Sequence, residues 1–251
     1  MRYRFTYLHK RKVLVLKKNI LIFLLLSLSA FQMASARSFG QVRNLINADN
    51  KPYHFGFILG FNSMDFNVSH NGIVDKDGNR WYADQTDLAV GFTVGIIGDL
   101  RLAESFNLRF TPALMFGDRT LKFVDQNGLN ELSVPVKSTI INFPLTVKAR
   151  GQRRGNWRPY LLAGGSATLD LGKQKENVIM LKMMDYGVEF GFGIDCYLPY
   201  FKLAPEFKMY LGLSDVLERN RPEILDIDDL KYTNALSKLT SRLFILSFNF
   251  E

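Results

Sequence analysis

The sequence predicts an all-β protein: an eight-stranded antiparallel up-and-down transmembrane β-barrel, preceded by a cleaved signal peptide. Three observations predict it. Apolar and polar residues alternate along eight long segments, the links between them alternate in length, and the chain begins with a basic and then apolar leader. Alternation at period two gives a strand one oily and one polar face. A tilted membrane-spanning strand needs about nine to eleven residues, more than most soluble strands have.

The first 36 residues have the pattern of a secretory signal peptide. A basic region without any acid is followed by an apolar run over 20–28 and by the small residues Ala34, Ser35 and Ala36, which predicts cleavage between Ala36 and Arg37. The alternative is a retained membrane anchor, but the apolar run is shorter than the about 20 residues that a spanning helix needs. The predicted organisation is a signal peptide at 1–36, a short periplasmic segment at 37–52 and an outer-membrane barrel at 53–251.

Removal of the leader changes the charge balance of the chain. The leader holds seven of the 32 Lys and Arg and none of the 24 Asp and Glu, so 25 basic residues (32 − 7) face 24 acidic ones and the net charge falls from +8 to +1. A nearly neutral protein gives no reason to expect nucleic acid as a partner. The single cysteine, Cys196, cannot form an intrachain disulfide and is interpreted as a small hydrophobic residue.

The clearest strand covers 183–198. Its uncharged phase is Met184, Tyr186, Val188, Phe190, Phe192, Ile194, Cys196 and Leu198, and its other phase is Asp185, Gly187, Glu189, Gly191, Gly193, Asp195 and Tyr197. The weakest strand is 158–170, because Leu161 and Leu162 fall on opposite phases. The eight predicted strands are 53–62, 88–102, 106–116, 132–149, 158–170, 183–198, 201–211 and 242–250.

Short and long links alternate strictly along the chain. The short ones are 103–105, 151–156 and 199–200, and the long ones are 69–87, 117–131, 171–182 and 212–240. Outer-membrane barrels have short periplasmic turns and longer outer loops, so both ends of the barrel chain are expected on the periplasmic side. Aromatic residues near the short links are expected at the periplasmic edge, namely Trp157, Tyr160, Tyr197, Tyr200 and Phe250.

A secreted soluble barrel of the lipocalin kind also has eight strands, with its apolar phase inside. Long strands, alternating link lengths, glycine on the polar phase and the aromatic last strand FILSFNFE favour the membrane barrel instead. The polar phase then lines a lumen that side chains can fill.

Charged residues on the polar phase are expected to pair across this lumen, because isolated buried charge is costly. Pairing predicts a salt-bridged plug, with an ion path as the alternative. The predicted lumen-facing charged network is Asp99, Arg101, Arg109, Lys148, Glu189, Asp195, Lys202, Glu206 and Lys208.

Little in the sequence indicates catalysis or metal binding. A lipid-modifying enzyme could use the hydroxyl, imidazole and carboxylates of one long link, but no nucleophile motif accompanies them; they are Ser69, His70, Asp75, Asp77, Asp84 and Asp87. The acidic stretch Asp226, Asp228 and Asp229 lacks the glycine turn and closing glutamate of a calcium loop. The sequence therefore predicts no enzyme, no cofactor and no metal site, and the expected partner is the lipid bilayer of the outer membrane.

Three segments resemble an outer-membrane β-barrel family found across Bacteroidota. INFPLTVK (141–148) resembles its E-x-P-L-x-x-K strand, with Asn142 where the family often has an acid, and RPYLLAGG (158–165) and YGVEFGFGID (186–195) are similar to the next two strands. Within this family, 99–119 resembles the PorT group of the type IX secretion system. The resemblance implies an accessory role in protein export across the outer membrane, beside other type IX components. The alternatives are a small porin-like structural or surface-binding barrel and the lipid enzyme.

Overall fold

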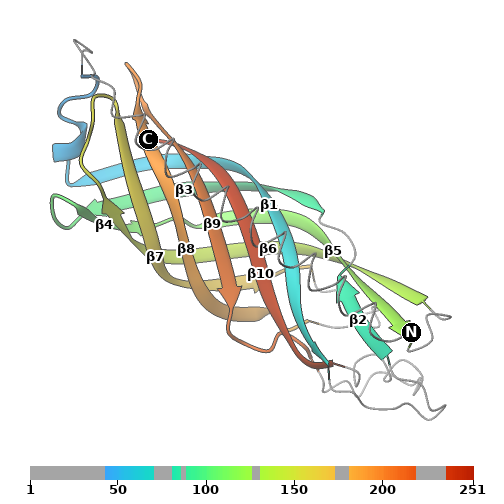
Figure 1. Ribbon diagram of the computed structural model, residues 1–251. Helices are drawn as coiled ribbons and strands as arrows, with labels where there is room; N and C mark the ends of the chain where they lie inside the picture. Colours follow the sequence, from blue (N-terminus) through green and yellow to red (C-terminus); the bar gives the residue numbers. More distant parts are fainter. Residues whose placement is uncertain (1–42, 71–80, 86–88, 126–130, 173–180, 219–235) are drawn as a thin grey trace, which may run out of the picture. The chain divides into compact units, whose positions relative to one another are not determined.

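The computed structural model describes residues 43–70, 81–85, 89–125, 131–172, 181–218 and 236–251 (Figure 1). The chain divides into two compact units, 1–42 and 43–251, and every described residue belongs to the second. The predicted signal peptide and its cleavage site between Ala36 and Arg37 lie outside the described residues.

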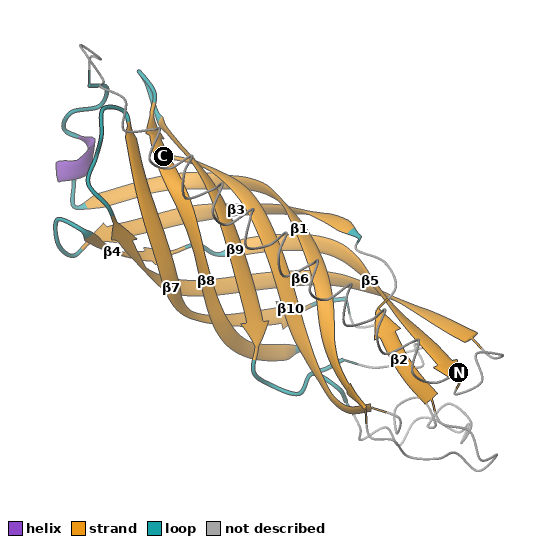
Figure 2. Ribbon diagram, in the orientation of Figure 1, coloured by secondary structure: helices purple, strands orange, loops and turns teal. Residues whose placement is uncertain are grey.

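These residues form one short 3₁₀ helix and ten strands (Figure 2). No helix among them has the length and hydropathy of a membrane-spanning segment. The elements are η1 (Ala48–Asn50), β1 (Tyr53–His70), β2 (Trp81–Gln85), β3 (Val90–Arg101), β4 (Phe106–Phe110), β5 (Ala113–Asp125), β6 (Glu131–Arg150), β7 (Trp157–Asp170), β8 (Met184–Tyr197), β9 (Lys202–Gly212) and β10 (Leu236–Phe250).

The strands close into an antiparallel ring with eight places. β1 pairs with β10 on one side and with β3 on the other, so Leu59 lies between Phe248 and Val94. β4 and β5 share one place between β3 and β6, and they are separated at Pro112, which has no N–H to donate to a ladder. The predicted eight-stranded up-and-down barrel is confirmed.

The walls at the long-link end are longer than the sequence predicted. β1 continues to His70, β5 to Asp125, and β10 begins at Leu236 rather than at Arg242. The prediction of a link over 69–87 is wrong in two respects, because β1 includes 69–70 and residues 81–85 form β2, paired with β5. The predicted ends followed the loss of alternation, whereas a strand needs only a partner for its backbone groups.

The apolar phase of the strands faces outward. Phe55 is 77% exposed while Asn62, on the other phase of β1, is buried. β7 is also regular, since Leu161 is 65% exposed and Leu162 is buried. Aromatic rings stack on this outer face, for example Phe57 on Phe250 with ring centres 4.7 Å apart. An apolar outer surface over a polar interior is the arrangement of a membrane barrel and the reverse of a soluble one.

Glycine on the inner phase makes room for two buried tyrosines. A Cβ added at Gly187 would lie 2.6 Å from a ring carbon of Tyr210, and one added at Gly193 would overlap the hydroxyl of Tyr160. Both tyrosines therefore pack against bare backbone of a neighbouring strand. Tyr160 and Tyr197, two of the aromatic residues predicted near the periplasmic edge, have their side chains buried inside the barrel.

Candidate functional site: a closed, charged lumen

Arg109 on β4 is the centre of an ion cluster inside the barrel. Its Nε donates to Asp99 Oδ2 and its Nη1 to Glu206 Oε2, each at 3.0 Å, while its Nη2 donates to Glu251. Asp99 lies directly opposite Arg109 in the β3–β4 register, but Glu206 comes from β9. The cluster therefore joins strands that are not neighbours, across the lumen.

Three lysines extend this cluster. Lys148 Nζ contacts both carboxylate oxygens of Asp195, at 2.9 and 3.0 Å. Lys202 pairs with Glu251 and lies 3.9 Å from Asp195. Lys208 bridges Glu189 at 3.2 Å and Glu206 at 3.5 Å. Every carboxylate of the cluster therefore faces at least one cation.

Neutral side chains add hydrogen bonds to these charges. Tyr160 donates its hydroxyl to Glu206 at 2.7 Å, and Asn107 donates to Asp99. Asn142 donates to Glu189 at 3.0 Å. An acid at position 142 would set one buried carboxylate against another, so the amide suits this lumen better than the acid of the resembling family.

The cluster blocks the lumen at this level. Its strand residues are at most 5% exposed, and it holds five carboxylates and four cations. Charges removed from water to this extent are tolerated only when they are paired and hydrogen-bonded. The members are Asp99, Arg109, Lys148, Glu189, Asp195, Lys202, Glu206, Lys208 and Glu251.

Eight of the nine residues of the predicted charged network lie in this cluster. Arg101, the ninth, is half-buried at the end of β3 and forms no ion pair with another described residue. Asp185 is buried in the lumen, and its carboxylate accepts from the hydroxyl of Tyr210 at 3.0 Å. The sequence reasoning missed Tyr160 and Glu251. Tyr160 could have been found, because it is two residues from the charged Arg158 and therefore lies on the same, inner face of the strand.

The end of the barrel that carries the short links is covered by residues 43–50, here called the strap, which include η1 (Figure 2). Asp49 of the strap accepts from Tyr197 Oη at 2.6 Å and pairs with Arg158 at 3.2 Å and with Arg150 and Arg153 at 3.4 Å. Burial of this carboxyl favours its neutral form, but the Tyr197 hydrogen bond and the charges of Arg158 and Arg150 outweigh it. The pKa of Asp49 therefore lies below its ordinary value.

An apolar layer fills the lumen toward the long links. It consists of Met64, Ala113, Met115, Ile140, Tyr210, Leu243 and Ile245. Val216 and Leu217, just after β9, are buried as well, and the Val216 N–H donates to Leu239 O. A buried cation lies at this end: Arg119 stacks 4.4 Å from the ring centre of Phe66, and its Nη2 is 3.6 Å from Asp170.

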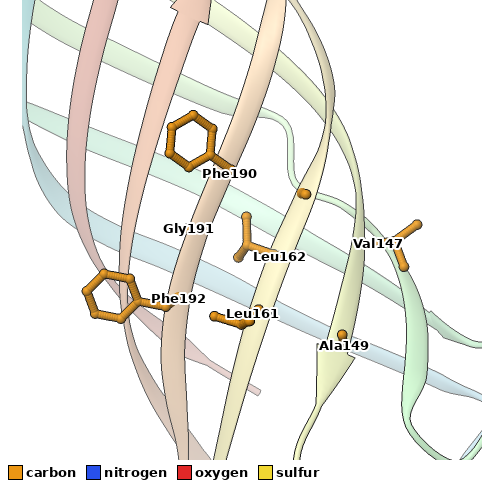
Figure 3. A pocket seen from close by; sticks show the side chains of 8 residues that line it. Val147, Ala149, Leu161, Leu162, Phe190, Gly191 and Phe192 are labelled. Atoms are coloured by element: carbon orange, nitrogen blue, oxygen red, sulfur yellow. The ribbon is translucent and has the colours of Figure 1, made fainter. Parts of the chain in front are cut away.

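An open apolar hollow of about 500 Å³ lies on the outer face of β6, β7 and β8 (Figure 3). It forms where the small Ala163 of β7 lies between Val147 and Phe190 in the sheet register. Its lining is almost wholly apolar, which suits hydrocarbon. The lining residues are Val147, Ala149, Leu161, Leu162, Ala163, Phe190, Gly191 and Phe192.

No metal-binding group of three or more His, Cys, Asp or Glu is present in the described part of the chain. Ser69 is exposed at the end of β1. The other residues considered for catalysis or calcium binding have side chains, or whole positions, outside the described residues: His70, Asp75, Asp77, Asp84, Asp87, Asp226, Asp228 and Asp229.

A closed antiparallel barrel with an apolar outer face and a charged interior defines an outer-membrane β-barrel protein. The sequence matches the family described as "Outer membrane protein beta-barrel domain" over residues 39–218. The chain belongs to this family, which places it in the bilayer of the outer membrane.

Several solved structures are similar to the chain. OprG from Pseudomonas aeruginosa has 12% identity and a TM-score of 0.45, over 78% of this chain and 94% of that one. Ail of Yersinia pestis has 10% identity and a TM-score of 0.34, over 80% and 98%. AlkL, determined in lipid bilayers, has 12% identity and a TM-score of 0.36, over 86% and 94%. No curated protein matches the sequence.

Proposed function

We propose that the protein is a non-catalytic accessory component of type IX protein secretion and acts through contacts with other components, not as a pore. The supporting observation is the blocked lumen, in which Arg109 is held between Asp99 and Glu206 by two 3.0 Å contacts. An exported protein cannot pass through a barrel filled in this way. The resemblance of 99–119 to the PorT group supports secretion as the process that the barrel serves.

The orientation is part of this proposal. The short links and the strap face the periplasm, as is usual for barrels with alternating link lengths. The long links, with the extended β1, β5, β6 and β10, then face the cell exterior. Contacts with secretion components are available at both ends and on the outer wall.

Deletion of the gene tests the secretion role. We expect type IX cargo to disappear from the medium and to accumulate in the periplasm, and a plasmid copy of the gene to restore export. An outer-membrane protein that does not use this pathway serves as the control for general damage to the membrane. Normal cargo secretion in the deletion strain would refute the proposal.

A porin-like barrel that binds a surface partner is the second candidate, and the strand lengths favour it. β1 has 18 residues and β6 has 20, whereas a tilted spanning strand needs about nine to eleven. The excess lies at the long-link end, where β2 adds to the wall. A deletion strain that secretes normally, with a surface-adhesion defect restored by the plasmid copy, would favour this candidate.

A further inference from the structure

The strap is held in place without a fully buried hydrophobic residue. None of the residues of η1 is buried, and Ile46 is 70% exposed. Leu45 has a φ of 50°, a left-handed conformation that is unfavourable for a residue with a side chain. The strap therefore depends on polar contacts, each of which contributes only about 0.5–1.5 kcal/mol net.

The surface beneath the strap carries more positive charge than the strap neutralises. Arg150, Arg153 and Arg158 share the single carboxylate of Asp49. Within 43–51 and 150–158 the sequence has six Lys and Arg and one acid. An acidic molecule that approaches this end is therefore attracted, and it finds guanidinium groups that are already oriented.

The same surface also binds main chain. Arg153 donates to the carbonyl oxygens of Asn44 and Leu45, and the Asn44 N–H donates to Asn156 Oδ1 at 2.9 Å. Tyr197 donates its hydroxyl to Asp49, and its carbonyl oxygen accepts from the side-chain Nδ2 of Asn44 at 3.0 Å. A peptide that carries a carboxylate can use all of these groups, whereas a lipid phosphate has no N–H to donate to Asn156 Oδ1.

We propose that Arg150, Arg153, Arg158 and Tyr197 form a binding site for an acidic peptide segment of a partner protein. Asp49 occupies this site in cis, and the partner binds by displacing the strap. This inference goes beyond the secretion role and does not depend on it. The closed strap competes with the partner and so lowers its affinity. Neutralising Asp49 removes this competition and raises the affinity by the same factor.

Binding of fluorescein-labelled hexaglutamate to the purified full-length protein in detergent tests the site. Fluorescence anisotropy should show about tenfold tighter binding to Asp49→Asn than to the wild type, if the carboxylate contributes about 1.4 kcal/mol to strap closure. Adding Arg153→Gln to Asp49→Asn should abolish the gain. Adding Arg154→Gln should preserve it, because Arg154 is an exposed residue of the same turn with the same charge. Neither arginine lies within a strand, so the barrel stays intact in both variants.

Hydrogen exchange gives a second readout. Hexaglutamate should speed amide exchange in 43–50 of the wild type, and phosphatidylglycerol at the same negative charge should not. Equal affinity of hexaglutamate for the wild type and Asp49→Asn, no binding to either, or equal losses with Arg153→Gln and Arg154→Gln would overturn the proposal. A response to Asp49→Asn seen only with phosphatidylglycerol would overturn it in favour of a lipid site.

Discussion

The two halves of the lumen are filled by different chemistry. Toward the short links the interior is an ion cluster around Arg109, and toward the long links it is a layer of Met64, Met115, Leu243 and Ile245. Ion pairs need defined geometry and a partner for every charge, whereas apolar side chains need only suitable volume. The comparison indicates that the short-link half fixes the strands relative to one another and that the long-link half tolerates change.

The largest expected effect is in the charged half. Arg109→Met leaves Asp99, Glu206 and Glu251 without their main cation and should destabilise the barrel by about 3–5 kcal/mol. Urea unfolding in detergent, followed by heat-modifiable gel migration, measures the loss. Arg101→Met is the matched control, because Arg101 forms no ion pair with a described residue, and it should change stability by less than about 0.5 kcal/mol. Similar losses in both variants would contradict the importance of the cluster.

A smaller effect is expected where a glycine makes room for a tyrosine. Gly187→Ala brings a methyl group against the Leu211 carbonyl oxygen and the ring of Tyr210 and should cost about 1–3 kcal/mol through overpacking. At Gly165, on the outer face, an added Cβ meets no atom within 4 Å, so Gly165→Ala should be neutral or slightly stabilising. Thermal unfolding of the two variants side by side checks this. If Gly165→Ala lowered the stability as much as Gly187→Ala, the cost would come from the backbone conformation of the strand and not from a clash with neighbouring atoms.

The apolar half should accept a substitution that keeps its volume. Met115→Leu is expected to cost less than about 1.5 kcal/mol, because the layer can repack around a side chain of similar size. Lys148→Met, a comparably conservative change in the charged half, leaves Asp195 with only the more distant Lys202 and should cost more. Urea midpoints in the opposite order would reverse the comparison between the two halves.

The smallest effect concerns the strap and depends on pH. Because the pKa of Asp49 is lowered in the folded protein, its contribution is complete above the ordinary carboxyl pKa and is lost as the pH falls through the lowered value. The groups that face Asp49 are Arg150, Arg153, Arg158 and Tyr197. His54 also contacts the strap, where its Nε2–H donates to Ala48 O at 2.7 Å. The protection of the amides in 43–50, measured relative to the intrinsic exchange rate at each pH, should therefore fall below about pH 4 in the wild type, and Asp49→Asn should show low protection at every pH. An unchanged pH profile in Asp49→Asn would contradict this role of Asp49.

Parity along the strands predicted most of the charged side chains that enter the lumen. Glu189 and Asp195 are both inside because they share the polar phase of β8, and a ring of such strands brings Lys148 and Lys208 to them. Which acid pairs with which base depends on register and strand tilt, which alternation does not encode. Arg119 was missed because alternation ends near the start of the link predicted at 117–131, although the backbone pairing of β5 continues.

The strap could not be predicted from local pattern. Residues 37–52 have no periodicity, and the contact of Asp49 with Arg150 joins positions 101 residues apart. The basic composition of 150–158 was visible in the sequence, but only the closed barrel brings the arginines to the strap. Local sequence patterns therefore predicted the strands and which of their side chains point outward. The site at the short-link end could be recognised only once the strands were closed into the barrel.

The conductance of the purified wild-type protein in a planar lipid bilayer tests the closed lumen most directly. With Arg109 held between Asp99 and Glu206, and apolar residues filling the other half, insertion should give no steady ion current. Insertion is verified independently by heat-modifiable migration of the protein recovered from the same lipid. A stable open-channel current from the wild type would contradict a plugged barrel and the accessory role proposed from it.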